Sequence, residues 1–571
     1  MDIKRDMLYQ MNMNAERIDH LVPTRICWQP LHRQARSILS TLRVQAITRA
    51  QESRPQDRAI NHHSCTTAST LKSTMSVEDI EYIPPAKLPE STDGEEGQKT
   101  SDQVDKVGWD GPDDPENPMN WPTWLKMVNV GLISCLTFLT PLASSMFAPG
   151  VPQVMKEFGS NDDLLADFVV SVYVLGFALG PMFLAPMSEL FGRLWIYHAT
   201  NVGFIVFSVL CAESSSVGML TACRFFQGVF GAAPITNGGG TIADLIAQEK
   251  RGAALGIFAL APVLGPVIGP VAGGFLVAAM GWRWVFWVLA MVGGALALLC
   301  LAFLRETYAA VILERKAARL RKQTNDSGLR SQMDRNLSVK QLFLRAIVRP
   351  SRILVFSPIV SALSLYMGVV YGYQYLLFST FTKAFQTQYG FSTSIVGLTF
   401  LGLGVGNLVG LAVISSLLDK LLKDRSKVTE ANPDGERKPE YRLIPLEWSS
   451  LSLPIGLFLY GWTMQYQVHW IVPLIGSAIY GFGQLAVFLC IMSYLIDAFG
   501  MYAASALAAN TVVRSIFGAV LPLAGARMYS VLGYGWGNSL LGFIALALVP
   551  IPFLLNRYGE TLRKRFDASR I

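Results

Sequence analysis

Twelve long apolar runs constrain the fold of this chain more than any other feature. Each is about 20 residues long, the length that an α-helix needs to cross about 30 Å of hydrocarbon. The runs lie near residues 126–147, 165–187, 195–213, 218–241, 253–279, 283–304, 353–379, 393–418, 446–465, 470–494, 504–529 and 539–556. Backbone polar groups in lipid must be bonded within helices. The sequence therefore predicts an all-α polytopic membrane protein.

Basic residues gather in the connections on one side of the predicted spans. They follow the sixth span, the eighth span and the last span: Arg305, Arg315, Lys316, Arg319, Arg321, Lys322, Arg330, Arg335, Lys340, Arg345, Arg349, Lys420, Lys423, Arg425, Lys427, Arg557, Arg563, Lys564 and Arg565. Loops rich in Lys and Arg stay in the cytoplasm, so both termini and the central loop are expected there. The net charge of +7 is then an orientation signal, and no nucleic-acid partner is expected.

The predicted spans divide into two sets of six. The expected organisation is a disordered cytoplasmic arm, a six-helix bundle, a basic central loop, a second six-helix bundle and a tail, at residues 1–120, 121–304, 305–352, 353–558 and 559–571. The arm is polar and basic and then acidic, with many Pro, Gly and Asp residues, a composition typical of disorder. Paired halves of this kind are the plan of secondary transporters that open a central cavity to each side in turn.

The fifth span carries glycine and proline at close spacing. These residues are Gly265, Pro266, Gly269, Pro270, Gly273 and Gly274. Prolines bend a membrane helix, and glycines leave a surface on which a neighbouring backbone packs closely. The stretch indicates a helix that bends or seals the bundle, with simple helix packing as the alternative.

Short motifs stand at fixed places relative to the spans. They are WDGPDDPENPMNWP at 109–122, APMSELFGR at 185–193, RFFQG at 224–228, NGGGTIAD at 237–244, RETY at 305–308, PEYR at 439–442 and AANTVVR at 508–514. With these motifs the chain resembles the major facilitator superfamily and, within it, the fungal twelve-span drug:proton antiporters. The resemblance covers residues 108–565 and implies two pseudo-symmetric six-helix bundles.

The resemblance also implies a set of coupling and gating residues. Glu189 and Arg193 belong to a motif that links helices on the cytoplasmic side of the family's fold, although Leu194 stands where a basic residue is common. The glycine and proline stretch is the family's antiporter motif, which favours export. Arg224 lies inside the fourth span, where a charge is costly. It is a candidate for proton coupling, with snorkelling toward the helix end as the alternative.

The acid that carries the proton stays open. Asp244, Asp167 and Glu447 are available near the ends of the fourth, second and ninth spans. None lies clearly at mid-membrane, and each also suits a structural charge at a helix end. Asp244 is included with the coupling residues.

Aromatic and amide side chains within the spans are the expected substrate contacts, because they suit amphipathic ligands of varied structure. The candidates are Tyr173, Phe177, Gln227, Asn237, Tyr371, Gln374, Tyr375 and Asn510. The sequence contains no phosphate-binding loop of the G-x-x-x-x-G-K-[ST] type and no nucleophile with an adjacent base. A proton gradient is therefore the expected energy source, with no cofactor and no enzymatic activity.

The sequence thus predicts a proton-driven antiporter that exports a small amphipathic organic compound, such as a toxin, a secondary metabolite or a drug. One alternative is a proton symporter for uptake of a nutrient, vitamin or polyamine. Another is a membrane sensor that does not transport. A monomer in the plasma membrane is expected, with the vacuolar membrane as the alternative location. Lipid, protons and the small-molecule substrate are the expected partners.

Overall fold

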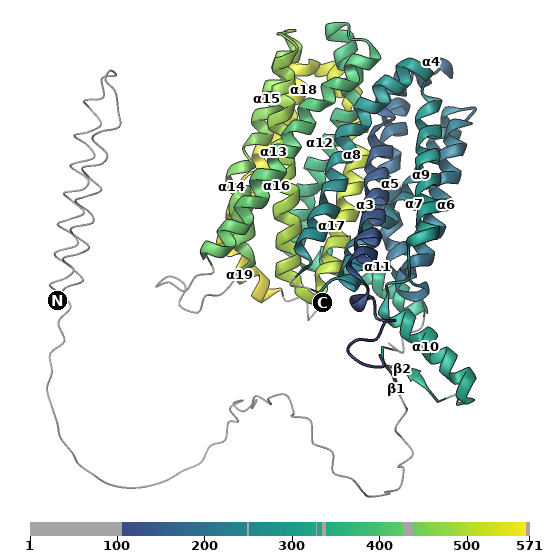
Figure 1. Ribbon diagram of the computed structural model, residues 1–571. Helices are drawn as coiled ribbons and strands as arrows, with labels where there is room; N and C mark the ends of the chain where they lie inside the picture. The colour runs from purple at the N-terminus through teal and green to yellow at the C-terminus, as the bar shows by residue number, and fades with distance from the viewer. Residues whose placement is uncertain (1–105, 248–249, 327, 334–338, 426–437, 567–571) are drawn as a thin grey trace, which may run out of the picture. The chain divides into compact units, whose positions relative to one another are not determined.

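The computed structural model describes residues 106–566, apart from 248–249, 327, 334–338 and 426–437. The first 105 residues of the predicted arm and residues 567–571 of the tail lie outside the described residues. Within the described part, helices predominate, and the two strands are two residues long each (Figure 1). The predicted all-α class is confirmed.

Most helices coincide with the apolar runs. The first half contains α3 (Thr123–Ser145), α4 (Val151–Glu157), α5 (Asp163–Phe191), α6 (Arg193–Ala212), α7 (Val217–Leu245), α8 (Gly252–Met280) and α9 (Arg283–Phe303). The connection contains α10 (Ala309–Thr324) and α11 (Val339–Phe356). The second half contains α12 (Pro358–Tyr389), α13 (Thr393–Arg425), α14 (Ile444–Ser449), α15 (Ser452–Gln465), α16 (Ile471–Phe499), α17 (Ala503–Val520), α18 (Gly525–Leu548) and α19 (Pro550–Arg565).

Length and apolar composition identify the membrane-crossing helices. Nine helical stretches of the described residues satisfy both criteria, or ten when α11 and α12, which meet at a 96° bend, count as one broken span. One of the nine is the 63-residue stretch Ala503–Arg565, which is about three times the length that a single crossing needs. The 29-residue α7 is not among them, but it packs along α5 and α6 inside the bundle.

The 63-residue stretch turns back on itself at Gly533, inside α18. Gly533 has φ +70° and ψ 174°, a backbone conformation that glycine adopts readily. The Tyr529 hydroxyl donates a hydrogen bond to Asn538 Oδ1 at 3.1 Å, whereas nine residues of a straight helix would separate them by about 13 Å. The stretch therefore contains two crossings. With α7 and α12, the described residues form the twelve crossings that the sequence predicts.

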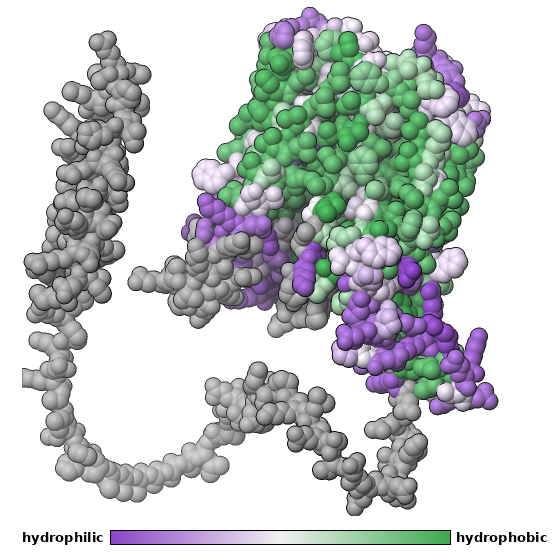
Figure 2. All heavy atoms as spheres, in the orientation of Figure 1, coloured by the Kyte–Doolittle hydropathy of each residue, from purple (hydrophilic) through white to green (hydrophobic). Residues whose placement is uncertain are grey.

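The two sets of six helices meet along a seam, which we define as the contacts of α3, α5 and α8 with α12, α13 and α17. Helix α5 packs on α17 and α12, and α8 packs on α13. We call the two ends of the bundle the α4 end and the α10 end, after the helices that lie there (Figure 1). In the face that Figure 2 shows, hydrophobic residues cover the side of the bundle and hydrophilic residues gather at both ends.

Residues 106–122 form an ordered segment that binds α10, although residues 106–120 fall within the arm predicted to be disordered. The strand β1 (Lys106–Val107) pairs in parallel with β2 (Arg330–Ser331), and η1 (Pro118–Asn120) follows. Lys316 of α10 lies 2.7 Å from Asp110 Oδ1 and 3.2 Å from Asp114 Oδ2. The acidic residues of this segment therefore pair with a basic helix that lies about 200 residues further along the chain. The composition of the segment alone does not reveal this pairing.

Asp114 should hold this segment on α10 in a pH-dependent way. The backbone N–H groups of Asp110 and Glu116, followed by Lys316, lower the pKa of Asp114 below its usual value. The ionised form stabilises the segment above the unfolded-state pKa of about 4, and that stabilisation is lost as the pH falls through the lower folded-state pKa. Asp114→Asn should make the amides of residues 106–122 exchange about tenfold faster at neutral pH, as measured by hydrogen–deuterium exchange.

The matched control is Asp113→Asn, because the Asp113 side chain is exposed and its replacement should leave exchange unchanged. Equal exchange rates in wild type and Asp114→Asn would contradict the assigned role of Asp114.

Candidate functional site

Arg224 of α7 is fully buried and binds the end of α3. Its Nη1 donates to the carbonyl oxygen of Ala143 at 2.9 Å, and its Nη2 donates to that of Ser144 at 3.2 Å. The last carbonyls of a helix have no partner within the helix, and the negative end of the helix dipole favours a cation there. Among the described residues, no carboxylate forms an ion pair with Arg224. Its charge is balanced by carbonyl oxygens.

Aromatic and amide side chains complete the surroundings of Arg224. The Arg224 guanidinium carbon lies 4.8 Å from the Tyr173 ring centre and 5.2 Å from that of Phe147. Gln227 accepts a hydrogen bond from Arg224 at 3.4 Å and donates one to Ser208 at 2.8 Å. Phe177 packs edge-on against Tyr173. The structure thus brings together four of the predicted site residues of the first half.

A row of polar and aromatic side chains continues from Arg224 across the seam. Ser144, whose carbonyl oxygen binds Arg224, forms a hydroxyl–hydroxyl hydrogen bond of 2.6 Å with Tyr375 of α12. The Tyr375 ring lies 5.1 Å from the Tyr371 ring, and the guanidinium carbon of Arg514 lies 4.8 Å from the centre of Tyr371. One arginine from each half therefore stands at either end of a connected row. We call Arg224, Ser144, Tyr375, Tyr371 and Arg514 the seam row.

The remaining predicted substrate residues lie at different places. Gln374 is buried on α12 between Tyr371 and Tyr375 in sequence. Asn510 of α17 donates to Ser364 at 3.4 Å, and its Oδ1 is buried without a partner. Asn237 accepts from Ser188 at 3.0 Å, and Ser188 in turn accepts from Arg193 at 3.3 Å. Asn237 therefore adjoins the motif residues at the α10 end.

Arg193 is the centre of a polar network at the α10 end. Its Nε lies 2.9 Å from Asp244 Oδ2, and its guanidinium carbon lies 5.2 Å from the Tyr308 ring. Glu306 accepts from the backbone N–H groups of Arg193 and Leu194 at 2.9 and 3.3 Å. Glu306 therefore binds the first amides of α6, where a helix offers unpaired donors and a positive dipole end.

The tight turn before α6 makes this contact possible. Gly192 has φ +95°, and a Cβ atom at this position would lie 2.1 Å from Glu306 Oε2. Glu189 is exposed near the end of α5. The sequence predicts Arg193, Asp244 and Glu189 as gating residues, but it gives Glu306 only as part of a motif. Glu306 and Arg193 are 113 residues apart in the sequence. The role of Glu306 is therefore visible only from its contact with Arg193 in the folded chain.

The second half repeats this arrangement of an arginine and an aspartate. Arg442, near the start of the ninth crossing (Pro439–Gln465), binds Asp497 near the end of the tenth (Ile471–Phe499) at 2.8 Å. This pair corresponds to Arg193 and Asp244, at the start of the third crossing and the end of the fourth. The pseudo-symmetry of the halves therefore extends to their charged ends.

The glycine and proline stretch of α8 lies between α3 and α13. A Cβ atom at Gly265 would lie 2.8 Å from the Leu142 nitrogen, and one at Gly273 would lie 1.9 Å from the Met146 carbonyl oxygen. On the other side, a Cβ atom at Gly274 would lie 2.9 Å from the Cα of Gly397 in α13. Gly269 faces Ser145 in the same row as Gly265 and Gly273. The glycines thus permit close approach to α3 and to the other half.

Pro262, Pro266 and Pro270 lie inside α8 at intervals of four residues. Two of them, Pro266 and Pro270, belong to the predicted motif. Each proline lacks the N–H that would bind the carbonyl one turn earlier. Three hydrogen bonds are consequently missing from the backbone of a helix that lies at the seam.

The three candidate acids differ in their partners. Asp244 pairs with Arg193, and Glu447 accepts from Asn556 at 2.7 Å. Asp167 is 5% exposed, forms no ion pair among the described residues, and has a buried Oδ2 without a hydrogen-bond partner. It lies close to Ser379 of α12 and Ala526 of α18, at the α4 end of the seam. Within the described residues, no group of three His, Cys, Asp or Glu side chains could hold a metal ion.

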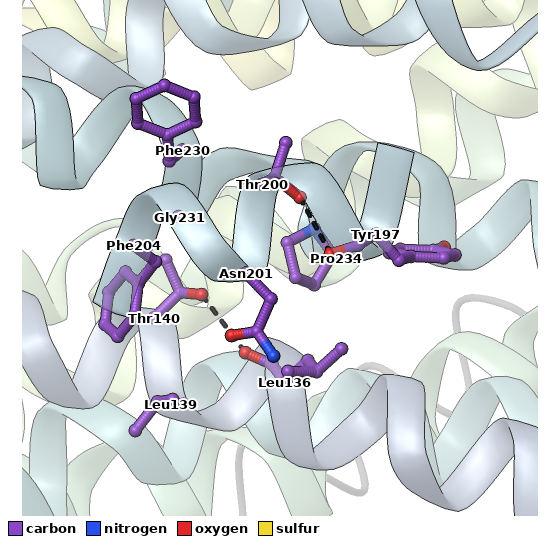
Figure 3. A pocket seen from close by; sticks show the side chains of 10 residues that line it. All are labelled: Leu136, Leu139, Thr140, Tyr197, Thr200, Asn201, Phe204, Phe230, Gly231 and Pro234. Carbon is purple, nitrogen blue, oxygen red and sulfur yellow. Dashed lines mark hydrogen bonds between the residues drawn. The ribbon is translucent and has the colours of Figure 1, made fainter. Parts of the chain in front are cut away.

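A small cavity lies within the first half, between α3, α6 and α7 (Figure 3). Thr140, Asn201 and Tyr197 provide polar atoms around it, and Leu136, Phe204 and Phe230 provide apolar walls. Its volume of about 10 Å³ is that of one water molecule, whereas organic ligands occupy several hundred Å³. None of the predicted substrate residues lines this cavity.

Comparison with known proteins decides the family. The model of the Major Facilitator Superfamily matches residues 133–522. The chain belongs to the major facilitator superfamily. The MFS-type transporter tndD of Aspergillus flavipes is 63% identical over 447 residues, covering 78% of this chain and 83% of that protein. The efflux pump radE of Floropilus chiversii is 52% identical over 438 residues, covering 77% and 81%.

Solved structures show the same fold. The xylose transporter XylE from E. coli, in a partially occluded inward open conformation, aligns with a TM-score of 0.57 at 15% identity, covering 76% of this chain and 98% of that one. The chain is therefore a multi-pass membrane transporter of the major facilitator superfamily and not an enzyme, and its relatives are fungal MFS-type transporters, one of which is named an efflux pump.

Proposed function

We propose that this major facilitator exports a small amphipathic organic compound in exchange for protons, by alternating access. The observation that carries the proposal is the seam row, which joins Arg224 of the first half to Arg514 of the second through Ser144, Tyr375 and Tyr371. Substrate sites of transporters with paired halves lie near the membrane midplane where the halves meet. Tyrosine rings with few polar groups suit an amphipathic cargo.

Two observations support export over uptake. Fungal relatives at 46–63% identity include one named an efflux pump, and α8 carries the glycine and proline stretch typical of antiporters. The basic helices α10 and α19 lie at one end of the bundle (Figure 1), and Arg193 contacts Tyr308, the residue before α10. By the positive-inside rule, we assign this α10 end and both termini to the cytoplasm, and we assign the monomer to the plasma membrane.

We assign proton exchange to Asp167. Its carboxyl group is buried between α5 of one half and α12 and α18 of the other, with Oδ2 unpartnered. Opening of the seam at the α4 end would expose this group to water and let it exchange a proton. One proton contributes about 2.3 kcal/mol per 100 mV and about 1.4 kcal/mol per pH unit. Together these support a cargo gradient of several hundredfold.

The experiment is steady-state accumulation of labelled amphipathic toxins in yeast that lacks its own pumps, with and without a protonophore. We expect wild type to lower accumulation several-fold, and the protonophore to remove the difference. Asp167→Asn should lose this uphill export, because an amide holds no proton to exchange. In proteoliposomes the same variant should retain exchange of labelled for unlabelled cargo, which requires no proton.

Asp163→Asn is the matched control, one turn away on α5. Asp163 is exposed and pairs with Lys383 at 2.8 Å, so its replacement should leave export unchanged. Uphill export by Asp167→Asn would overturn the assignment of the acid. Raised accumulation in wild type would favour uptake, and unchanged accumulation across the panel would favour the sensor.

A further inference from the structure

Arg514 is a half-buried cation whose hydrogen-bonding capacity is largely unused. It is the twelfth residue of α17, about 16 Å from the start of that helix, which places it at mid-membrane. Its guanidinium carbon lies 4.8 Å from the Tyr371 ring and 5.5 Å from the Phe488 ring. Its Nε is buried without a partner. Among the described residues, no carboxylate or carbonyl oxygen forms a hydrogen bond or an ion pair with Arg514.

Arg224 and Arg514 differ in their hydrogen bonds. Arg224 is bound by the protein itself, whereas Arg514 is available to a ligand. Arg224 makes three hydrogen bonds to backbone carbonyls and one to Gln227. Arg514, within the described residues, lies against the faces of two aromatic rings and makes no hydrogen bond. A cation at this depth is costly unless it pairs or faces a water-filled pathway, and such residues mark substrate or ion routes.

Two further side chains on α16 and α17 have oxygen atoms without hydrogen-bond partners. Asn510 lies one turn before Arg514 on α17, and its Oδ1 is buried without a donor. Gln484 lies one turn before Phe488 on α16, and its Oε1 is likewise buried without a donor. Three side chains on two helices, α16 and α17, thus present buried polar atoms without hydrogen-bond partners, which is unusual.

We propose that Arg514 binds an anionic group of the cargo, so that the transporter selects amphipathic organic anions such as carboxylates or enolates. This inference rests on the proposed function and specifies its substrate class. Guanidinium matches a carboxylate through two parallel hydrogen bonds. The apolar body of the cargo would lie against Tyr371 and Phe488, whose rings flank the guanidinium. Asn510 and Gln484 would accept hydrogen bonds from cargo hydroxyl groups.

The test measures binding to purified full-length protein in lipid nanodiscs without any gradient. The probe is fluorescein, an anionic xanthene dye, followed by fluorescence anisotropy, and rhodamine 123 is the cationic xanthene counterpart. A panel of aromatic carboxylic acids and their methyl esters competes with the bound dye. We expect fluorescein to bind at least tenfold more tightly than rhodamine 123, and the acids to compete at least tenfold better than their esters.

Variants distinguish the effect of losing the Arg514 charge from the effect of losing the fold. Arg514→Gln should lose the tenfold preference for acids, and Arg514→Lys should keep part of it. The matched control is Arg349→Gln, because Arg349 also lies over a tyrosine, 4.2 Å from the Tyr502 ring, but on α11. It should bind as wild type does. Size-exclusion profiles and melting temperatures show whether each variant is folded.

Equal competition by acids and esters, absence of binding by every acid in the panel, or an acid preference that survives in a folded Arg514→Gln would each overturn the proposal. Since binding is measured without a gradient, it is independent of the export assay. Export without an acid preference would overturn only this inference. An acid preference without export would overturn only the proposed function.

Discussion

We expect Arg224→Leu to abolish export and to lower the free energy of unfolding by about 3 kcal/mol. The leucine leaves the carbonyl oxygens of Ala143 and Ser144 buried without donors, each costing about 1–3 kcal/mol. Ser144 also binds Tyr375, so disorder at the end of α3 would reach the seam row. Thermal unfolding of the purified variant and toxin accumulation in yeast measure the two effects.

Arg224→Lys is the companion variant. An ammonium group keeps the charge but lacks the planar fork that reaches several carbonyls at once, so stability should lie between those of wild type and Arg224→Leu. A leucine variant with wild-type stability and no export would contradict the structural role and leave Arg224 as a coupling residue alone.

The second large effect concerns Gly273. A Cβ atom there would lie 1.9 Å from the backbone oxygen of Met146, and a backbone atom cannot rotate away. Gly273→Ala should therefore push α3 and α8 apart, at a cost of about 1–3 kcal/mol, and should remove most export. The measurement is the melting temperature of purified protein together with accumulation in yeast.

Gly256→Ala is the control on the same helix, because a Cβ atom at Gly256 meets nothing within 4 Å. This variant should be as stable as wild type or slightly more stable, since alanine favours a helix by about 0.5–1 kcal/mol over glycine. Gly273→Ala with wild-type stability and export would show that α3 and α8 do not pack as described.

The crossings could be predicted from the sequence because apolar composition sets them locally. The ends of the helices could not be predicted in this way. The seventh crossing was expected at 353–379, whereas α12 runs from Pro358 to Tyr389. Pro358 begins the helix after the break at Ser357, and polar residues such as Lys383 and Gln386 continue it beyond the apolar run. Hydropathy marks the lipid-embedded part of a helix and not its full length.

The contacts between the site residues could not be predicted from the sequence, because they join segments that lie far apart along the chain. The motifs identify Arg193 and Asp244, but the carboxylate that binds the first amides of α6 comes from Glu306. Arg514 stands in a motif, yet its lack of partners depends on which side chains α12 and α16 present to it. Likewise, Asp167 differs from Asp244 only in what the folded chain places beside it.

The missing hydrogen bonds of α8 have a mechanical consequence. Bending an ordinary helix stretches or breaks the hydrogen bonds on one side, whereas at Pro262, Pro266 and Pro270 no such bond exists to be stretched. The elastic work of flexing α8 is therefore lower than for its neighbours. Helix α8, which lies against both α3 and α13, can thus bend at low energetic cost. This lets the two halves tilt while the glycine contacts of α8 persist.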